Sequence, residues 1–283
     1  MPCGVLSAEI PIMRYDPAAP PLAVGQRARR GRLSWAVGTS TLILLVGALA
    51  WLYRAELTCL TAKPPPSELT APPVPDPVTY AVLVDEIDYH RTKLANKYHA
   101  AETDVERKVV LQSAKNLLEL TMPQMMSCWL GTPWDFNGTA SSPGAGKVAC
   151  GYFVSTVMRD AGFDVHRIRL AQQPSQNILR TFLPRNQLKI TVAVNYNNYM
   201  QSMRKRPHGI YIIGLDRHVG FIVHNAAGLR FIHSGGATHR VVNESESDAQ
   251  SIRHSRYRVI GNLTANAELL RKWLLQEPFP TQS

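Results

Sequence analysis

Hydrophobic and polar positions follow different patterns in successive parts of the chain, and the first three parts show no folded domain. Residues 1–32 have no helical or alternating period and contain five prolines, which predicts a disordered tail. Residues 33–53 lack charged side chains and are long enough to cross a hydrocarbon layer of about 30 Å as a helix. Residues 54–78 contain seven prolines, so we expect an extended linker.

A helical period begins near Thr79, where apolar residues recur at spacings of three and four. The period is interrupted near residues 101–104, with Thr103 or Asp104 as the N-cap of a second helix. Residues 79–126 therefore predict a helical hairpin that packs on the domain after it.

Residues 127–283 combine one helical pattern with several short strand patterns. Gly- and Pro-rich loops precede a helix that we expect to begin at Cys150 and to end at Gly162. Further along, turn residues separate short apolar runs, which predict strands at 189–194, 210–215, 218–224 and 229–233. A helix followed by neighbouring strands indicates an α+β domain with an antiparallel sheet.

Charge decides the orientation of the apolar segment. Arg27, Arg29, Arg30 and Arg32 precede it and only Arg54 follows closely, so the N-terminus is expected in the cytoplasm. We therefore predict a single-pass protein of the cytoplasmic (inner) membrane, anchored through residues 33–53, with its main domain periplasmic or extracellular. A cleaved signal peptide, ending at the small residues 48–50, stays the alternative.

The net charge of +10 favours an anionic partner but does not choose one. No zinc-finger, RNP or helix-turn-helix signature accompanies the basic residues, so nucleic-acid binding is not expected. The four cysteines lack CxxC spacing, which argues against a zinc site. Cys59 and Cys128 could pair in an oxidising compartment, and the sequence leaves this open.

Cys150 is the strongest candidate for chemistry because it stands at a predicted helix start. The partial positive charge there, with an imidazolium nearby, would stabilise a thiolate, and the Cys150 amide could bind an oxyanion. His218 follows a turn at residues 216–217 and could reach the cysteine as a base. His233, at the end of the next strand, could hold the His218 tautomer by a hydrogen bond. Gly220 would leave room for a substrate.

The segments ACGYFVSTVM, HVGFIV and FIHSG resemble the motifs of the NlpC-type branch of papain-like cysteine peptidases. The resemblance extends from Trp129 to about Gly236 and implies a papain-like fold, in which the helix carrying the cysteine packs on an antiparallel sheet. It implies that Cys150 is the nucleophile, His218 the general base and acid, and His233 the orienting residue. It also implies hydrolysis of amide bonds in peptidoglycan stem peptides, with no cofactor and no metal.

Four residues are expected to contact substrate. Trp134 falls where the family places an aromatic residue, and Asn137 is in the turn three residues after it. Gly151 follows Cys150 directly, and Asp216 is two residues before His218. The family's Asp-Cys-Ser core is Ala149-Cys150-Gly151 here, which removes a carboxylate that grips the substrate amine in many members. Asp216 could instead orient His218.

Two other functions stay open. A Cys-His pair can also transfer an acyl group to an amine or a lipid. A catalytically silent domain that binds wall peptides or a protein is the third reading. Among rival residues, we expect Cys128 to be buried or disulfide-bonded, His224 to be a weaker candidate for substrate contact, and His239 and His254 to face water. The sequence indicates no particular oligomeric state.

Overall fold

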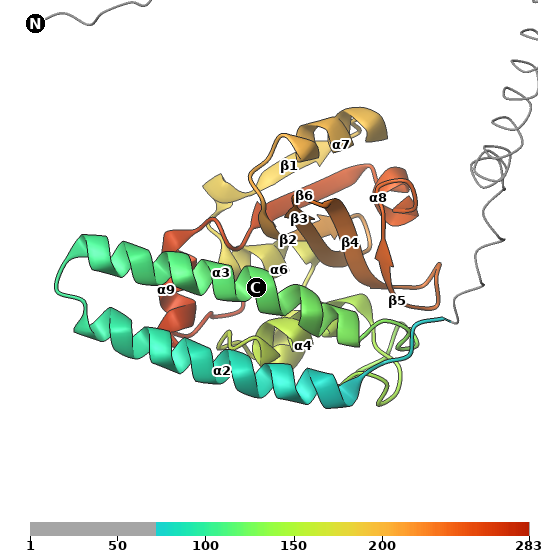
Figure 1. Ribbon diagram of the computed structural model, residues 1–283. Coiled ribbons are helices and arrows are strands. Elements are labelled where there is room, and N and C mark those ends of the chain that lie inside the picture. Colours follow the sequence, from blue (N-terminus) through green and yellow to red (C-terminus); the bar gives the residue numbers. More distant parts are fainter. Residues whose placement is uncertain (1–71, 283) are drawn as a thin grey trace, which may run out of the picture. The chain divides into compact units, whose positions relative to one another are not determined.

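The computed structural model describes residues 72–282, which form an α+β fold around one antiparallel sheet of six strands (Figure 1). The predicted tail, membrane span and most of the linker lie outside these residues. Within them, no helix is both long enough and apolar enough to cross a membrane. The elements are α2 (Pro77–Ala100), α3 (Asp104–Cys128), α4 (Cys150–Asp160), α5 (Arg167–Ala171), α6 (Ser175–Phe182), η1 (Arg185–Gln187), β1 (Lys189–Val192), α7 (Tyr196–Arg204), β2 (Gly209–Leu215), β3 (Val219–Asn225), β4 (Gly228–Gly235), β5 (Arg240–Glu244), α8 (Gln250–His254), β6 (Tyr257–Asn262) and α9 (Ala267–Leu274).

The sheet has the order β1-β6-β2-β3-β4-β5, and every neighbouring pair is antiparallel. Side chains on β2 alternate between two cores, because successive residues of a strand point to opposite faces. Ile210 and Ile212 belong to the larger core under α4, whereas Tyr211 and Ile213 belong to a smaller core with residues of α7 and α8. The sheet is therefore covered on both faces.

Local signals set the start of the two long helices. The Asp76 carboxylate accepts a hydrogen bond from the Thr79 backbone N–H at 2.9 Å, and Pro77 stands in the first turn of α2. Thr103 is the N-cap of α3 and forms a capping box with Glu106. Of the two N-caps considered from the sequence, the structure thus has Thr103.

The helical hairpin shares its core with the rest of the described chain. Three edge-to-face aromatic contacts lead from α2 to the sheet: Tyr80 with Trp129, Trp129 with Phe153 of α4, and Phe153 with Phe221 of β3. Their ring centroids lie 5.7, 5.9 and 5.9 Å apart. Each such pair is worth about 0.5–1.5 kcal/mol beyond the area it buries. The hairpin and the sheet are therefore parts of one compact unit, and α2 and α3 lie side by side next to α9 (Figure 1).

Several elements carry no pattern that the sequence analysis identified. Strands β5 and β6 were not predicted, and neither were the short helices between Arg167 and Arg204 or α9. Strand β5 is short and ends on a polar residue, and β6 pairs with β1 and β2, which lie far away in the sequence. Strand β5 forms a hairpin with the preceding β4, but its short sequence of mixed polarity gives no strand period. The pairing of β6 is non-local, which local periodicity does not report.

Candidate active site

Cys150 is the first residue of α4, and the loop before it is held to the sheet. The Ser234 hydroxyl, on β4, donates to the Val148 carbonyl at 2.7 Å, and the Val148 backbone N–H donates to the Pro133 carbonyl at 2.9 Å. Ala149 is the N-cap and offers no side-chain acceptor, so the first helical N–H groups have no cap from that side chain. The start of α4 therefore presents backbone donors around a half-buried thiol.

His218 stands between β2 and β3 at the end of a tight turn. The Leu215 backbone N–H donates to the His218 carbonyl at 2.8 Å, which closes the turn. The two carboxylate oxygens of Asp216 accept from the backbone N–H groups of Arg256 and Tyr257 at 2.8 and 2.9 Å. Asp216 thus attaches the turn to the start of β6, and its carboxylate makes no hydrogen bond to the His218 ring.

A chain of hydrogen bonds leads from His218 into the sheet. Nε2 of His218 lies 2.7 Å from Nδ1 of His233, and Nε2 of His233 lies 3.0 Å from a carboxylate oxygen of Glu244. His233 is 1% exposed and the Glu244 side chain 14%, so water competes little for these contacts. Phe231 stacks on the His233 ring with the centroids 4.1 Å apart.

The Glu244 carboxylate decides which nitrogen donates and which accepts in each of these hydrogen bonds. An ionised carboxylate only accepts hydrogen bonds, so Nε2 of His233 carries a proton and Nδ1 of neutral His233 is an acceptor. Nε2 of His218 must then be the donor between the two rings. This order leaves the lone pair on Nδ1 of His218 free to act as a base.

Gly220 makes room for the second histidine rather than for a substrate. A Cβ at this position would lie 2.8 Å from Cβ of His233 and 2.8 Å from the Phe231 ring. The expectation that Gly220 opens the surface to a substrate is therefore wrong, because His233 and Phe231 fill that space. Glycine allows the His233 ring to lie close against β3 and to reach His218.

Burial disfavours the charged forms of both Cys150 and His218. It raises the pKa of the Cys150 thiol, while the backbone N–H groups of Val219, Gly151 and Cys150 itself act in the opposite direction. Burial, together with the neighbouring His233, lowers the pKa of His218 to about 3. Both pKa shifts disfavour the thiolate–imidazolium pair expected from the sequence and favour a thiol beside a neutral imidazole.

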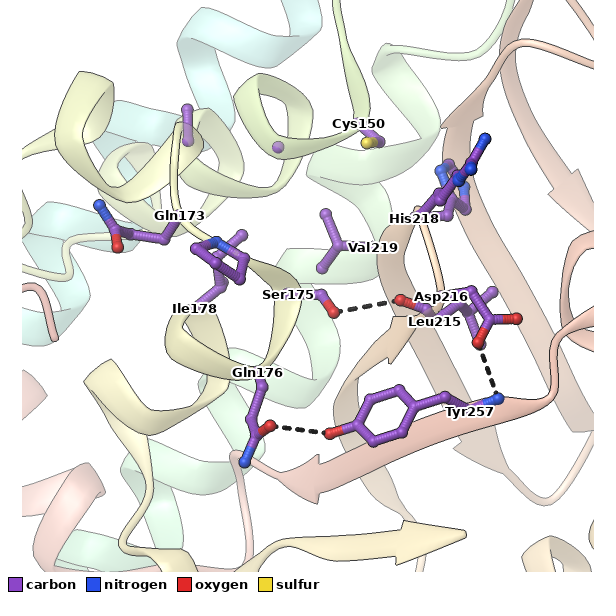
Figure 2. Close-up of a pocket in the computed structure, with 14 residues that line it drawn as sticks. Cys150, Gln173, Ser175, Gln176, Ile178, Leu215, Asp216, His218, Val219 and Tyr257 are labelled. Carbon is purple, nitrogen blue, oxygen red and sulfur yellow. Dashed lines mark hydrogen bonds between the residues drawn. The ribbon is translucent and has the colours of Figure 1, made fainter. Parts of the chain in front are cut away.

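Two cavities meet at Cys150 and have Cys150, Gly151, Ala171, Arg217 and His218 in common. The first, which we call the Ser175 cavity, has a volume of about 480 Å³ and is shown in Figure 2. Its further lining combines apolar side chains with the polar side chains of Gln173, Ser175, Gln176, Asp216 and Tyr257. The second, the Trp134 cavity, has a volume of about 590 Å³, and its further lining includes Trp134, Phe136, Asn137, Tyr152 and Gln172.

The structure brings the seven predicted site residues into one region. Cys150, Gly151 and His218 line both cavities, Trp134 and Asn137 line the Trp134 cavity, and Asp216 lines the Ser175 cavity. His233 lies behind His218 and does not line either one. Gly151 also has a packing role, because a Cβ there would lie 2.2 Å from the Ala171 carbonyl oxygen of α5.

The rival residues lie elsewhere. Cys128 is buried at the end of α3, burial raises the pKa of its thiol, and it lines a different cavity beside Asp76. His224 is buried and contacts His208 at the other end of the β2–β3 hairpin. His239 and His254 are exposed, as expected.

Two residues of the site were not found from the sequence. Glu244 lies on β5, which had no detectable strand pattern, and it reaches His233 diagonally across the register, since Phe231 is its direct partner. Arg217 is a turn residue whose position only the fold reveals. The one local signal for Glu244 is the apolar pair Val241-Val242, which two polar residues, Asn243 and Glu244, follow.

Among residues 72–282, no group of three or more His, Cys, Asp and Glu side chains is arranged to hold a metal ion. The chemistry available to the described residues is nucleophilic attack by a thiol, with an imidazole as proton acceptor and donor. Comparison with family models, curated proteins and solved structures gives no match for this chain.

Proposed function

We propose that this protein is a membrane-anchored cysteine hydrolase with a papain-like, NlpC-type fold, and that it cleaves amide bonds in peptidoglycan stem peptides. One observation carries the proposal: Cys150, at the first turn of α4, lines the same two cavities as His218, and His233 and Glu244 hold His218 from behind. A buried cysteine with only a structural role would need none of these partners.

The proposed reaction has four steps. The Cys150 thiol passes its proton to Nδ1 of His218 as the sulfur attacks the amide carbonyl carbon. The Cys150 backbone N–H at the helix start stabilises the oxyanion that forms. His218 then protonates the leaving amine, and the C–N bond breaks to leave a thioester. Water, deprotonated by His218, attacks the thioester and releases the carboxylic acid and the thiol.

Two features support a peptide substrate. The cavities extend from Cys150 in two directions, so an extended chain has space on both sides of the scissile bond. Amide side chains of Gln173, Gln176 and Gln172 line these cavities and can bind peptide groups. The wall substrate itself rests on the family resemblance and on the predicted export of the domain. The linker would then confine the enzyme to wall near the membrane.

The direct test incubates the full-length protein, in detergent, with purified peptidoglycan fragments and identifies products by mass spectrometry. We expect a mass gain of one water per cleaved amide and a new free amine. The Cys150→Ala variant is the control and should give no product while it keeps the fold. Intact fragments with the wild-type protein, or equal cleavage by Cys150→Ala, would contradict the proposal.

Acyl transfer is the second candidate, because the Trp134 cavity is large enough, at about 590 Å³, to admit an acceptor beside the thioester. Adding a small primary amine to the same incubation separates the two activities. A hydrolase would form the free acid as its main product, whereas a transferase would form the new amide. A protein that forms neither, with an unreactive Cys150, would be the silent binding domain.

A further inference from the structure

We infer that the substrate presents a carboxylate next to the scissile amide and that Arg217 binds it. The inference rests on the proposed function, and it names the chemical class that the site selects. The substrate would be a peptide with a free acid at this position, in preference to the corresponding primary amide.

Arg217 is placed for this role. It lies in the turn immediately before His218, it is exposed, and it lines both the Ser175 and the Trp134 cavities. No hydrogen bond or ion pair to another of residues 72–282 engages its guanidinium. A guanidinium that borders the reacting thiol and has no internal partner is free to bind a ligand.

The remaining charges of the site do not favour a substrate amine. Among the residues that line the two cavities, Asp216 is the one carboxylate, and both of its oxygens accept backbone N–H groups of β6 and the residue before it. The residue before the nucleophile is Ala149, so no carboxylate stands at the helix start. The first turn of α4 instead adds a partial positive charge at Cys150.

The two positive features reinforce each other. Arginine binds a carboxylate through two parallel N–H···O bonds, a geometry that a neutral amide cannot match. A hydrogen bond between charged groups in a partly enclosed site changes binding by about tenfold or more. We therefore expect discrimination by charge at this position, rather than by shape alone.

A matched pair of small thiol reagents tests the inference without a known substrate. Iodoacetate and iodoacetamide are similar in size and differ in charge, and both alkylate the thiol with loss of iodide. Their rates at Cys150 are measured in the full-length protein at pH 8 from the alkylated Cys150 peptide by mass spectrometry. The iodoacetate-to-iodoacetamide rate ratio is then divided by that of 2-mercaptoethanol, a neutral free thiol.

We expect the normalised ratio to be about ten in the wild-type protein, to fall close to one in Arg217→Gln, and to be intermediate in Arg217→Lys. Arg180→Gln removes an exposed arginine of α6 that lines neither cavity, and it should keep the wild-type ratio. Addition of 1 M NaCl should lower the wild-type ratio, because the interaction is electrostatic.

The outcomes separate the two proposals. A wild-type ratio near one, or a ratio that Arg217→Gln does not change, overturns the role of Arg217 and leaves the nucleophile in place. No alkylation of Cys150 by either reagent, in a folded protein, overturns the cysteine hydrolase and the inference that rests on it.

Discussion

Two histidine pairs lie at opposite ends of the β2–β3 hairpin, and their ring positions are similar. His218 and His233 have ring centroids 4.7 Å apart with an angle of 85° between the rings. His208 and His224 also have centroids 4.7 Å apart, with an angle of 72°. Each pair contains one buried imidazole, His233 in the first and His224 in the second. Proximity alone therefore does not distinguish the candidate active site from the other end of the hairpin.

The pairs differ in what fixes their protons. Nitrogen atoms of His218 and His233 approach to 2.7 Å, and Glu244 determines which nitrogen of His233 carries the proton. Nδ1 of His224 is buried without a hydrogen-bond partner among the described residues, and His208 is exposed. The first pair also borders a thiol at a helix start. A carboxylate that accepts a hydrogen bond from one ring can fix the tautomers of both histidines, so that one nitrogen is left as a base. No carboxylate forms such a hydrogen bond with His208 or His224 among the described residues.

The largest contrast should come from removing one member of each pair. His218→Asn should lower kcat/KM for peptidoglycan fragments by about four orders of magnitude, because the thiol then has no proton acceptor. His208→Asn, at the exposed end of the hairpin, should change it less than twofold. Steady-state cleavage rates of both variants, with circular dichroism to verify folding, measure the contrast. Similar losses in the two variants would show that the pairs do not differ in function.

Much of this contrast could be predicted from the sequence, because Cys150 and His218 stand beside a helix start and a turn that the local sequence indicates. A Gly-rich loop before an amphipathic run indicated the helix start at Cys150, and a two-residue turn indicated the position of His218. The order Cys150, His218, His233 along the chain then suggested the site. The antiparallel α+β architecture followed from the same patterns.

The parts that could not be predicted depend on register and burial. Glu244 reaches His233 only because β5 pairs with β4 in one particular register, and no local period identifies β5. The role of Gly220 depends on how closely the His233 ring packs against β3. The pKa shifts depend on how far the site is shielded from water. A cysteine at a helix start is expected from the sequence to be acidic, whereas burial raises the pKa of the half-buried Cys150 thiol.

The next largest effect of the His218 site should be on how the free energy of unfolding depends on pH. The pKa of His218 is about 3 in the folded protein and about 6.5 when unfolded, so below pH 6.5 the unfolded chain binds a proton that the native site does not. Above pH 6.5 His218 is neutral in both the folded and the unfolded protein, so it does not make stability depend on pH. The free energy of unfolding then falls as the pH drops from 6.5 towards 3. Because His218 is partly exposed, we expect a loss of about 2–3 kcal/mol by pH 4.

Urea unfolding at pH 7.5, 5.5 and 4 measures this loss. His218→Asn should flatten the profile over this range, because asparagine does not titrate. Burial and the neighbouring His208 also lower the pKa of His224, so His224→Asn should flatten the profile in the same direction. A profile that is steeper in His218→Asn than in the wild-type protein would reverse the sign of the argument.

The smallest expected effect comes from Glu244→Gln, which tests whether the tautomers of His218 and His233 matter. Glu244→Gln keeps the shape and one acceptor but removes the charge that holds the proton on Nε2 of His233. Because the amide can also donate to that nitrogen, His233 can adopt the other tautomer and donate from Nδ1 to His218. Nδ1 of His218 then carries the proton and cannot accept one from the thiol. We expect kcat to fall about ten- to hundredfold, with KM nearly unchanged.

Glu246→Gln is the matched control, since Glu246 is two residues further along and pairs with Arg204 instead of a histidine. Activity should then be close to wild type. Long-range ¹H–¹⁵N correlation spectra of the imidazoles supply a readout that activity alone does not. The wild-type protein should show Nε2–H on both His218 and His233, and Glu244→Gln should show a mixture of tautomers. If the tautomers stay unchanged while kcat falls, Glu244 acts only through its charge on the imidazolium, and the ordered hydrogen-bond chain is not what distinguishes this pair from His208 and His224.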